Sequence, residues 1–446
     1  MKTENNSFLS NSILTLTRQL IGIVIGVLVV SIVARGLGST RNGEYTLITY
    51  VPIMLMTFLN LGINSSTVYY VGRKKISINS AYTTNIIISI ALSIISILIG
   101  AAAIYILKDS YFKQTNTGLL YLSLLSLPGI FLMTFMQTIL QGMEHFRSYN
   151  TALVVQQFSN LFFLVVFLFV IPLGVLGTIL AFILGYVCSV VYMTFFLIKY
   201  SEASFSFHYF SFSELKELLT YGIKAHVSNI MTFFNYRLDV FLVANFLSMH
   251  YVGVYTFAVN IGERLSIFSQ SISQVLLPRI AATNAEEDRN QITSMVSRFL
   301  MILVLLMSVA LFIVSGLIVR LLGGADYPES PMLLRWIIPG VAVLAVEKIL
   351  SNDLAGRGKP ELNMYVSFFN VALNVVLNLI LIPKIGVAGA AISTTITYVA
   401  SFIIKCWIYK KETKMRYRTF LVMTSSDFAL IKKIFQGIRG KLAVNK

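Results

Sequence analysis

The chain has 446 residues, of which 56% are hydrophobic and 12% charged, and its net charge is +16. A soluble protein carries roughly 25% charged residues, so this composition excludes a water-soluble globular domain and predicts helices that face lipid. The two cysteines, Cys188 and Cys406, lie in apolar stretches and follow no disulfide or metal-ligand spacing. We therefore expect no metal and no other cofactor.

Apolar stretches long enough to span a bilayer, about 20 residues each, recur along the whole chain. They predict about twelve transmembrane helices, at residues 12–34, 45–71, 81–107, 117–141, 150–171, 174–198, 222–246, 251–278, 299–319, 332–354, 361–382 and 386–409. The first is long enough to span and no cleavage site follows it, so we interpret it as a helix and not as a signal peptide.

The basic residues are concentrated in the loops that share a side with the N-terminus. This positive-inside bias places both termini in the cytoplasm. The excess of positive charge is then explained by topology and by anionic lipid headgroups, and nucleic acid is not an expected partner.

An internal repeat divides the predicted helices into two sets of six. GVLG at 174–177 matches GVAG at 386–389 at an offset of 212 residues, and GEYT at 43–46 matches GVYT at 253–256 at an offset of 210. An even number of helices gives both copies the same orientation in the membrane. We therefore predict an all-α integral membrane protein of two parallel six-helix bundles that face each other across a cleft. The predicted parts are an N-terminal bundle (1–200), a cytoplasmic linker (201–218), a C-terminal bundle (219–410) and a basic cytoplasmic tail (411–446).

The predicted helix at 222–246 is polar on two faces. At 100° per residue, Arg237 and Asp239 point about 200° apart, so they cannot pair with each other. His226 and Asn229 share the face of Arg237. A helix with two polar faces cannot lie against lipid with either, so we expect it to be central in the bundle.

Other charges also fall within predicted helices, and two interpretations of them stay open. The candidate cations are Arg18, Arg237 and Arg264, and the candidate carboxylates are Asp239, Glu263 and Glu347. They can form buried ion pairs, with a structural or a coupling role. Alternatively, the excess of arginine marks a cleft for an anionic ligand, because guanidinium binds phosphate bidentately and stays charged when partly desolvated.

Asparagines follow one face of the predicted helix at 361–382. Asn370, Asn374 and Asn378 are spaced by four residues. Such a ladder is most often a set of hydrogen bonds between helices, and the other possibility is the lining of a site for a polyhydroxylated ligand. Under the second interpretation, the candidate sugar contacts are His226, Asn229, Asn370, Asn374 and Asn378.

Several short motifs along nearly the whole chain carry a family resemblance. They are ARGLGSTRNGEYTL (34–47), LQGMEHFRSYN (140–150), NYRLDVFLV (235–243), VGVYTFA (252–258), LAGRGKPELN (354–363) and the two GVxG helix starts. Together they resemble the polysaccharide transporter branch of the multidrug/oligosaccharidyl-lipid/polysaccharide flippase superfamily, which includes the MATE transporters, and within that branch the O-antigen flippases.

The resemblance implies a V-shaped fold and a function. It implies a non-enzymatic flippase of the inner membrane that moves an undecaprenyl-pyrophosphate-linked oligosaccharide from cytoplasm to periplasm by alternating access. Arg18 matches a cavity arginine of related lipid-linked precursor flippases, and Arg237 matches the arginine of the family's R-x-D pattern. The implied partners are this substrate, membrane lipids, a polysaccharide polymerase and a chain-length regulator.

Two alternatives remain at this point. A drug/cation antiporter would share the fold, but its cavity should be acidic or neutral. A membrane-embedded polymerase or acyltransferase usually places catalytic residues on long periplasmic loops, and the predicted outer loops are short. The chain has no Walker A loop, H-E-x-x-H or G-x-S-x-G motif, and an ATP-driven pump is therefore not expected.

Overall fold

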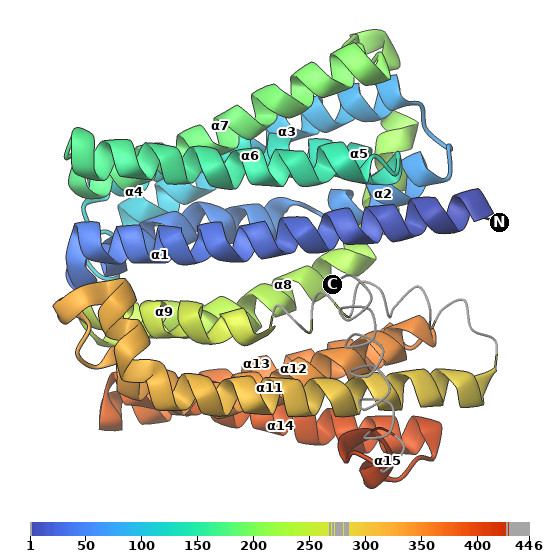
Figure 1. Ribbon diagram of the computed structural model, residues 1–446. Helices are drawn as coiled ribbons and strands as arrows, with labels where there is room; N and C mark the ends of the chain where they lie inside the picture. Colours follow the sequence, from blue (N-terminus) through green and yellow to red (C-terminus); the bar gives the residue numbers. More distant parts are fainter. Residues whose placement is uncertain are drawn as a thin grey trace, which may run out of the picture. The chain divides into compact units, whose positions relative to one another are not determined.

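The computed structural model describes residues 2–266, 269, 272, 280, 285–424 and 427, without the side chains of residues 2–20, 224, 225 and 228. In this part of the chain the regular structure is helical (Figure 1). The α-helices are α1 (Lys2–Leu59), α2 (Ile63–Gly72), α3 (Ile78–Leu107), α4 (Thr117–Leu124), α5 (Leu127–Gly142), α6 (Phe146–Val165), α7 (Gly174–Ser201), α8 (Phe212–Phe246), α9 (Met249–Gly262), α11 (Glu286–Gly323), α12 (Ser330–Gly356), α13 (Pro360–Ile385), α14 (Val387–Thr413) and α15 (Tyr417–Leu421). A π-helical turn at Val166–Val170 follows α6, and 3-10 turns lie at Phe207–Tyr209, Glu263–Leu265 and Gly324–Asp326.

Side-chain caps explain where several of these helices begin. Ser77 precedes α3 and accepts a hydrogen bond from the Ser80 amide at 3.1 Å. Asn116 does the same for α4, and Ser211 for α8. Each cap satisfies an amide of the first turn that has no partner within the helix.

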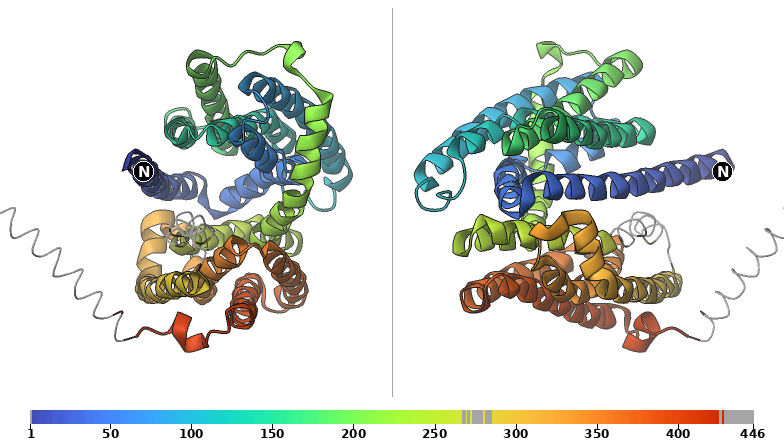
Figure 2. Two further views of the ribbon diagram at one scale, coloured as in Figure 1. Left: turned by 90° about the vertical axis from the view of Figure 1, so that its right-hand side faces the viewer. Right: turned by 60° about the vertical axis from the view of Figure 1, so that its left-hand side comes forward.

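The structure corrects two helices predicted from hydropathy and shows where the helix after the predicted linker begins. The predicted helix at 45–71 is broken, because α1 ends at Leu59 and α2 begins at Ile63 after Gly62, which has a φ of 73°. The predicted helix at 117–141 is divided into α4 and α5. Part of the predicted linker at 201–218 is helical, since α8 begins at Phe212 behind its Ser211 cap (Figure 2). Mean hydropathy does not reveal such breaks and caps, because they do not change the mean polarity of a segment.

Eight helical segments of the described chain are long and apolar enough to cross a membrane. They are Ile21–Leu59, Ile78–Leu107, Thr117–Gly142, Phe146–Val170, Gly174–Ser201, Glu286–Asp326, Pro360–Ile385 and Val387–Thr413. The first of them overlaps the predicted spans 12–34 and 45–71, which are separated by the non-helical Gly38 (φ 73°, ψ 174°). The total of twelve spans stays a prediction.

The chain forms two compact units. Unit 1 holds residues 1–261, 315–334 and 371–393, and unit 2 holds 262–314, 335–370 and 394–446. The boundaries between the units fall inside α11, α12, α13 and α14. The predicted division into an N-terminal and a C-terminal bundle rests on the sequence repeat, whereas the two units are defined by contacts. The predicted division therefore stays a prediction.

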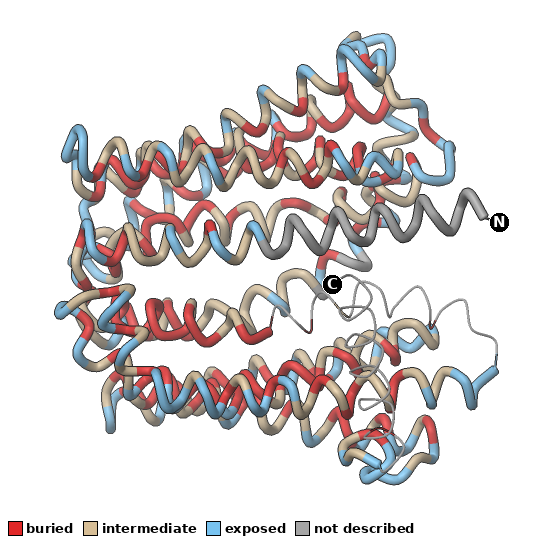
Figure 3. The backbone as a smooth tube through the Cα atoms, in the orientation of Figure 1, coloured by how far each residue is buried: buried red, intermediate tan, exposed pale blue. Residues whose placement is uncertain are grey.

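Within unit 1, α6 packs along α7 and α1, while α5 packs against α2 and α3. One apolar core lies among these helices, with Met136, Ile139, Leu140 and Met193 all nearly fully buried. Figure 3 shows that α9, also in unit 1, is buried along most of its length. Burial on all sides is expected for a helix that does not face lipid.

Unit 2 has two smaller apolar clusters. One contains Leu300, Val304, Ala345 and Ile349, from α11 and α12. The other joins α12 and α14 to the short helix α15, through side chains that include Leu354, Cys406, Tyr409 and Phe420. Packing of Phe420 in this cluster holds α15 at the end of α14.

The repeat motifs have the same local geometry in both copies. Gly174 and Gly386 have φ values of 59° and 64°, in the left-handed region that favours glycine. Three residues on, a Cβ at Gly177 would lie 2.8 Å from the Phe167 carbonyl oxygen, and one at Gly389 would lie 2.5 Å from that of Leu381. Each pair forms a tight turn that enters a helix. This agreement supports the repeat locally, and superposition of the two whole halves stays a prediction.

Candidate functional site

Arg237 lies on α8 against an aromatic surface of α1. Its guanidinium carbon is 5.5 Å from the centroid of the Tyr50 ring, and its Nη1 donates to the Tyr236 carbonyl at 3.0 Å. Phe241 is tilted against the same tyrosine at 6.4 Å. The side chain is half-buried. A planar cation held on an aromatic face keeps its charge while its orientation is restricted.

Asp239 serves a different contact. It is 5% exposed, and the hydroxyl of the fully buried Tyr255 on α9 donates to its Oδ2. Its Oδ1 accepts from the Val240 amide at 2.8 Å. Asp239 therefore joins α8 to α9.

His226 is placed for helix contact. It is 5% exposed, and its Nε2 lies 3.0 Å from the Phe58 carbonyl oxygen at the end of α1. Because a carbonyl can only accept, Nε2 carries the proton in this contact. Asn229, one turn along α8, is half-buried. The geometry favours a packing role for His226 over a sugar contact.

The two copies of the GxYT motif pack directly against each other in unit 1. A Cβ at Gly43 of α1 would lie 1.9 Å from the Met249 carbonyl oxygen, and one at Gly253 of α9 would lie 1.9 Å from that of Ser39. Side chains larger than glycine therefore cannot occupy either position without displacing backbone. The equivalent residues of the repeat form one close helix crossing, which we call the α1–α9 crossing.

Polar contacts surround the α1–α9 crossing, and the sequence reasoning missed them. The hydroxyl of Ser39 lies 2.8 Å from His250 Nδ1, and His250 Nε2 lies 3.3 Å from a carboxylate oxygen of Glu329. Asn42 donates to the Tyr327 hydroxyl at 3.0 Å. These contacts tie α1 and α9 to the turn between α11 and α12. A histidine and a carboxylate in two predicted outer loops were the only signal for them in the sequence.

Glu347 pairs with a lysine that the sequence reasoning also missed. Lys405 of α14 is 1% exposed, and its Nζ lies 3.7 Å from Glu347 Oε1. The same Nζ donates to Asn363 Oδ1 at 2.5 Å, and Ser351 donates to Glu347 at 2.7 Å. The single lysine in the apolar run FIIKCWIY could have revealed it. A buried pair with these hydrogen bonds corresponds to the first of the two interpretations above, in which charges within helices form buried ion pairs.

The asparagine ladder on α13 is buried. Asn370 donates to the Ser401 hydroxyl on α14 at 2.7 Å, and its Oδ1 is buried without a partner among the described residues. Asn378 donates to the Asn374 carbonyl and side-chain oxygens at 2.8 and 2.9 Å. The exposed fractions are 3%, 3% and 0% for Asn370, Asn374 and Asn378. These contacts favour packing over a ligand lining.

Three predicted residues have limited structural description. Arg18 lies on α1, where its side chain is outside the described residues. Glu263 and Arg264 lie in the 3-10 turn that follows α9 and are half-buried. The predicted helix at 251–278 continues into residues that the structure describes only in part. A site shared by Arg18, Arg237 and Arg264 stays a prediction.

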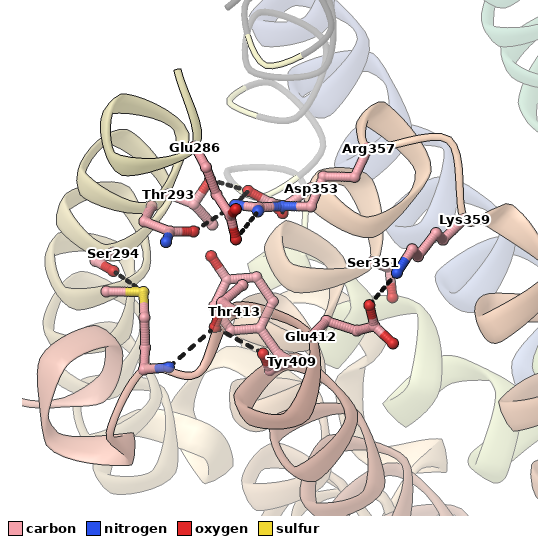
Figure 4. Close-up of polar contacts among 12 residues, drawn as sticks. Glu286, Thr293, Ser294, Ser351, Asp353, Arg357, Lys359, Tyr409, Glu412 and Thr413 are labelled. Atoms are coloured by element: carbon pink, nitrogen blue, oxygen red, sulfur yellow. Dashed lines mark hydrogen bonds and ion pairs between the residues drawn. The ribbon is translucent and has the colours of Figure 1, made fainter. Parts of the chain in front are cut away.

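Arg357 of the LAGRGKPELN motif and the preceding Asp353 form a buried polar cluster in unit 2 (Figure 4). Asp353 is fully buried and accepts from the Thr293 hydroxyl and from Arg357 Nε. Arg357 also donates to Asn290 at 2.7 Å and lies over the ring of Tyr409. The motif therefore joins α11, α12 and α14, and its role here is structural.

A second ion pair holds the chain beyond α15. Arg298 of α11 binds Asp427 bidentately, with N–O distances of 2.7 and 2.8 Å, and also donates to the Thr419 carbonyl. Hydrogen bonds from Arg298 lower the pKa of Asp427 from its ordinary 3.8 to about 2. At neutral pH both partners of the pair are therefore charged.

Comparison with known proteins gives consistent results. The sequence profile described as "Lipid II flippase MurJ" matches residues 73–439. The "Putative O-antigen transporter" of Shigella flexneri is 22% identical over 419 residues, which cover 91% of this chain and 98% of that protein. The "Probable low-salt glycan biosynthesis flippase Agl15" of Haloferax volcanii is 26% identical over 198 residues. That match covers 44% of this chain and only 42% of the relative.

Solved structures share the fold. An inward-facing multidrug resistance MATE family transporter of the MOP superfamily aligns with a TM-score of 0.75 at 16% identity, over 90% of this chain and 98% of that one. The lipid II flippase MurJ in its inward closed conformation aligns with a TM-score of 0.71, also at 16% identity, over 98% of this chain and 97% of that one. The predicted all-α membrane transporter fold is therefore confirmed.

Proposed function

Because the chain belongs to the family described as the lipid II flippase MurJ, we propose that it moves an undecaprenyl-pyrophosphate-linked oligosaccharide, a repeat unit of an O-antigen or related surface polysaccharide, across the membrane. Family membership makes it a multi-pass membrane transporter and not an enzyme. The match to a putative O-antigen transporter over 98% of that protein's length favours an O-antigen-type oligosaccharide as the substrate over lipid II itself.

The chemistry of the substrate fits particular side chains. A pyrophosphate needs cations that stay charged near lipid, and arginine meets this need. We assign Arg237 to the pyrophosphate because Tyr50 and the Tyr236 carbonyl orient its half-buried guanidinium. Arg18 and Arg264 complete the proposed cationic site. His226 and the asparagine ladder make packing contacts, so Asn229 is the remaining candidate that we propose as a sugar contact.

Orientation and partners follow from the same proposal. The bias of basic residues favours cytoplasmic termini, and the proposed transport runs from the cytoplasmic to the outer face of the cell's inner membrane. A polysaccharide polymerase on the outer face would consume the product, and a chain-length regulator would act with it. Asp239 and Glu347 hold helices together in this scheme, through Tyr255 and Lys405.

The decisive experiment replaces Arg237 in a strain that lacks its own flippase. One strong charge-assisted contact is worth about 1.5–3 kcal/mol, so Arg237→Ala should lower transport roughly tenfold to a hundredfold. Arg237→Lys should retain part of the activity through charge alone. The measurement is surface polysaccharide, normalised to the amount of each variant in the membrane.

Arg320→Ala is the matched control, because Arg320 is an exposed arginine of α11. It should display wild-type polysaccharide. If Arg237→Ala does the same at normal abundance, Arg237 does not bind the pyrophosphate. The fold is also that of drug antiporters, so proteoliposomes that take up a fluorescent organic cation and flip no lipid-linked oligosaccharide would overturn the proposed function itself.

A further inference from the structure

An apolar groove of about 440 Å³ opens on the surface of unit 2, between α14 and α15. Its lining includes Phe402, Ile403, Cys406 and Trp407 of α14, and Tyr417 and Leu421 of α15. Ile403 and Trp407 are 60% and 55% exposed. We call it the α14–α15 groove, and both helices that line it are visible in Figures 1 and 2.

The α14–α15 groove is held open by buried contacts. Phe420 is fully buried, and its ring lies 5.1 Å from that of Tyr409. On the other side of α15, Arg298 donates to the Thr419 carbonyl and pairs with Asp427. The helix α15 is thus fixed against α11 and α14, so the exposed apolar side chains do not result from loose packing.

Cations border one end of the groove. The ammonium of Lys410 lies 4.8 Å from the centroid of the Tyr417 ring, and that of Lys411 lies 5.6 Å from the Trp407 ring. Both lysines are exposed, as are Arg416 and Arg418 of the adjoining segment. The nearby Glu412 is bonded to Lys359. Positive charge therefore dominates where the apolar lining ends.

We propose that the α14–α15 groove binds an anionic phospholipid, with its phosphate at Lys410 and Lys411 and an acyl chain along Trp407 and Ile403. The groove covers the last turns of a segment long and apolar enough to span the membrane. From Ile403 to Lys410 the helix rises about 10 Å, which carries the site from hydrocarbon to headgroup depth. An exposed tryptophan between the two is typical of that boundary.

The positive charge beside the α14–α15 groove favours an anionic lipid over the chain's own C-terminal tail as the occupant. After Asp427, the charged residues of the sequence are Lys432, Lys433, Arg439, Lys441 and Lys446. Such a segment would bring cations to a border that is already cationic. An anionic lipid supplies the missing negative charge together with the apolar chain that the groove accommodates. This proposal does not rest on the transported substrate.

Tryptophan fluorescence tests the proposal in the full-length chain. The chain has two tryptophans, so Trp336→Phe leaves Trp407 as the sole tryptophan reporter at the groove. This variant is placed in vesicles that contain brominated phosphatidylglycerol or brominated phosphatidylcholine, whose bromines quench a neighbouring indole. We expect stronger quenching by the anionic lipid, and a preference that weakens with added salt.

Lys410→Gln with Lys411→Gln should remove most of this preference. Each cation near the surface is worth a factor of about five, so the relative association should fall by up to roughly thirtyfold. Lys74→Gln with Lys75→Gln is the matched control, since these are also adjacent exposed lysines but belong to unit 1. It should leave the quenching of Trp407 unchanged. The unfolding temperature of each variant shows that it is folded.

Three results would overturn the proposal. Equal quenching by both lipids would show no selection for charge. An unchanged preference after loss of Lys410 and Lys411 would place the selection elsewhere. Absence of quenching by either lipid would show that the groove is closed to lipid, as it would be if another part of the chain filled it. None of these readouts measures transport, so they leave the proposed function untouched.

Discussion

Replacing Lys405 with methionine tests whether the buried pair with Glu347 stabilises unit 2. Lys405 is 1% exposed, and the side chain of Glu347 is 11% exposed. Methionine keeps most of the volume of lysine but leaves the Glu347 carboxylate without its cation. Breaking a buried pair from one side costs about 3–5 kcal/mol. Asn363 also loses a donor at 2.5 Å, although the two losses are coupled and do not add.

The assay is thermal unfolding of the purified protein in detergent, together with its abundance in the membrane. A loss of this size should lower the unfolding temperature by about 3–5 °C, because the unfolding entropy of a chain of this length is roughly 0.9 kcal/mol/K. Lys384→Met is the control, because Lys384 is exposed at the end of α13. It should leave the unfolding temperature within a degree or two of wild type.

A second substitution separates the charge from the hydrogen bond. Adding Glu347→Gln to Lys405→Met removes the unpaired charge, so the double variant should recover part of the lost stability. No recovery would mean that the loss comes through Asn363. If Lys405→Met itself unfolds at the wild-type temperature, the pair does not stabilise the fold and the reasoning is refuted.

Three further predictions concern packing and charge. Gly43→Ala or Gly253→Ala should lower membrane abundance strongly, because a Cβ would lie 1.9 Å from a carbonyl oxygen, whereas Gly316→Ala on α11, with open space around it, should be neutral or slightly stabilising. Asn370→Leu should reduce stability or abundance before it reduces transport per molecule, and a transport defect at normal abundance would favour a ligand role instead. Asp427→Asn should lower the unfolding temperature at neutral pH. The folded pKa of Asp427 is lowered to about 2 from 3.8, so its contribution to the free energy of unfolding is present above pH 4 and is lost as the pH falls toward 2. The unfolding temperatures of wild type and variant should therefore converge near pH 2.

Hydropathy and pattern predicted the class of the protein well. Long apolar stretches were sufficient to predict α3, α7, α13 and α14, because a helix in lipid must satisfy its backbone internally and therefore needs a continuous apolar run. The repeat pairs Gly174 with Gly386, and both are left-handed glycines in the structure. The resemblance to oligosaccharide flippases was confirmed by the family match.

Partners of the polar residues could not be predicted in the same way. One face of α8 could be assigned from spacing, but the contact of Asp239 with Tyr255 depends on the position of α9. Lysine near a helix end usually extends to the interface, and only the fold shows Lys405 buried beside Glu347. His226 had the spacing of a ligand-facing residue, yet its nearest partner is a backbone carbonyl at the end of another helix.

Sequence by itself determined that this chain is a helical membrane transporter, since composition and apolar length decide which solvent each helix needs. Only the tertiary structure decided that Gly43 meets Gly253, that the asparagines of α13 bond to α14 and to one another, and that α15 forms one wall of a groove on α14. The physical reason is that burial depends on a residue's own polarity, whereas a hydrogen bond or a close crossing depends on the position of a second element that lies far away along the chain.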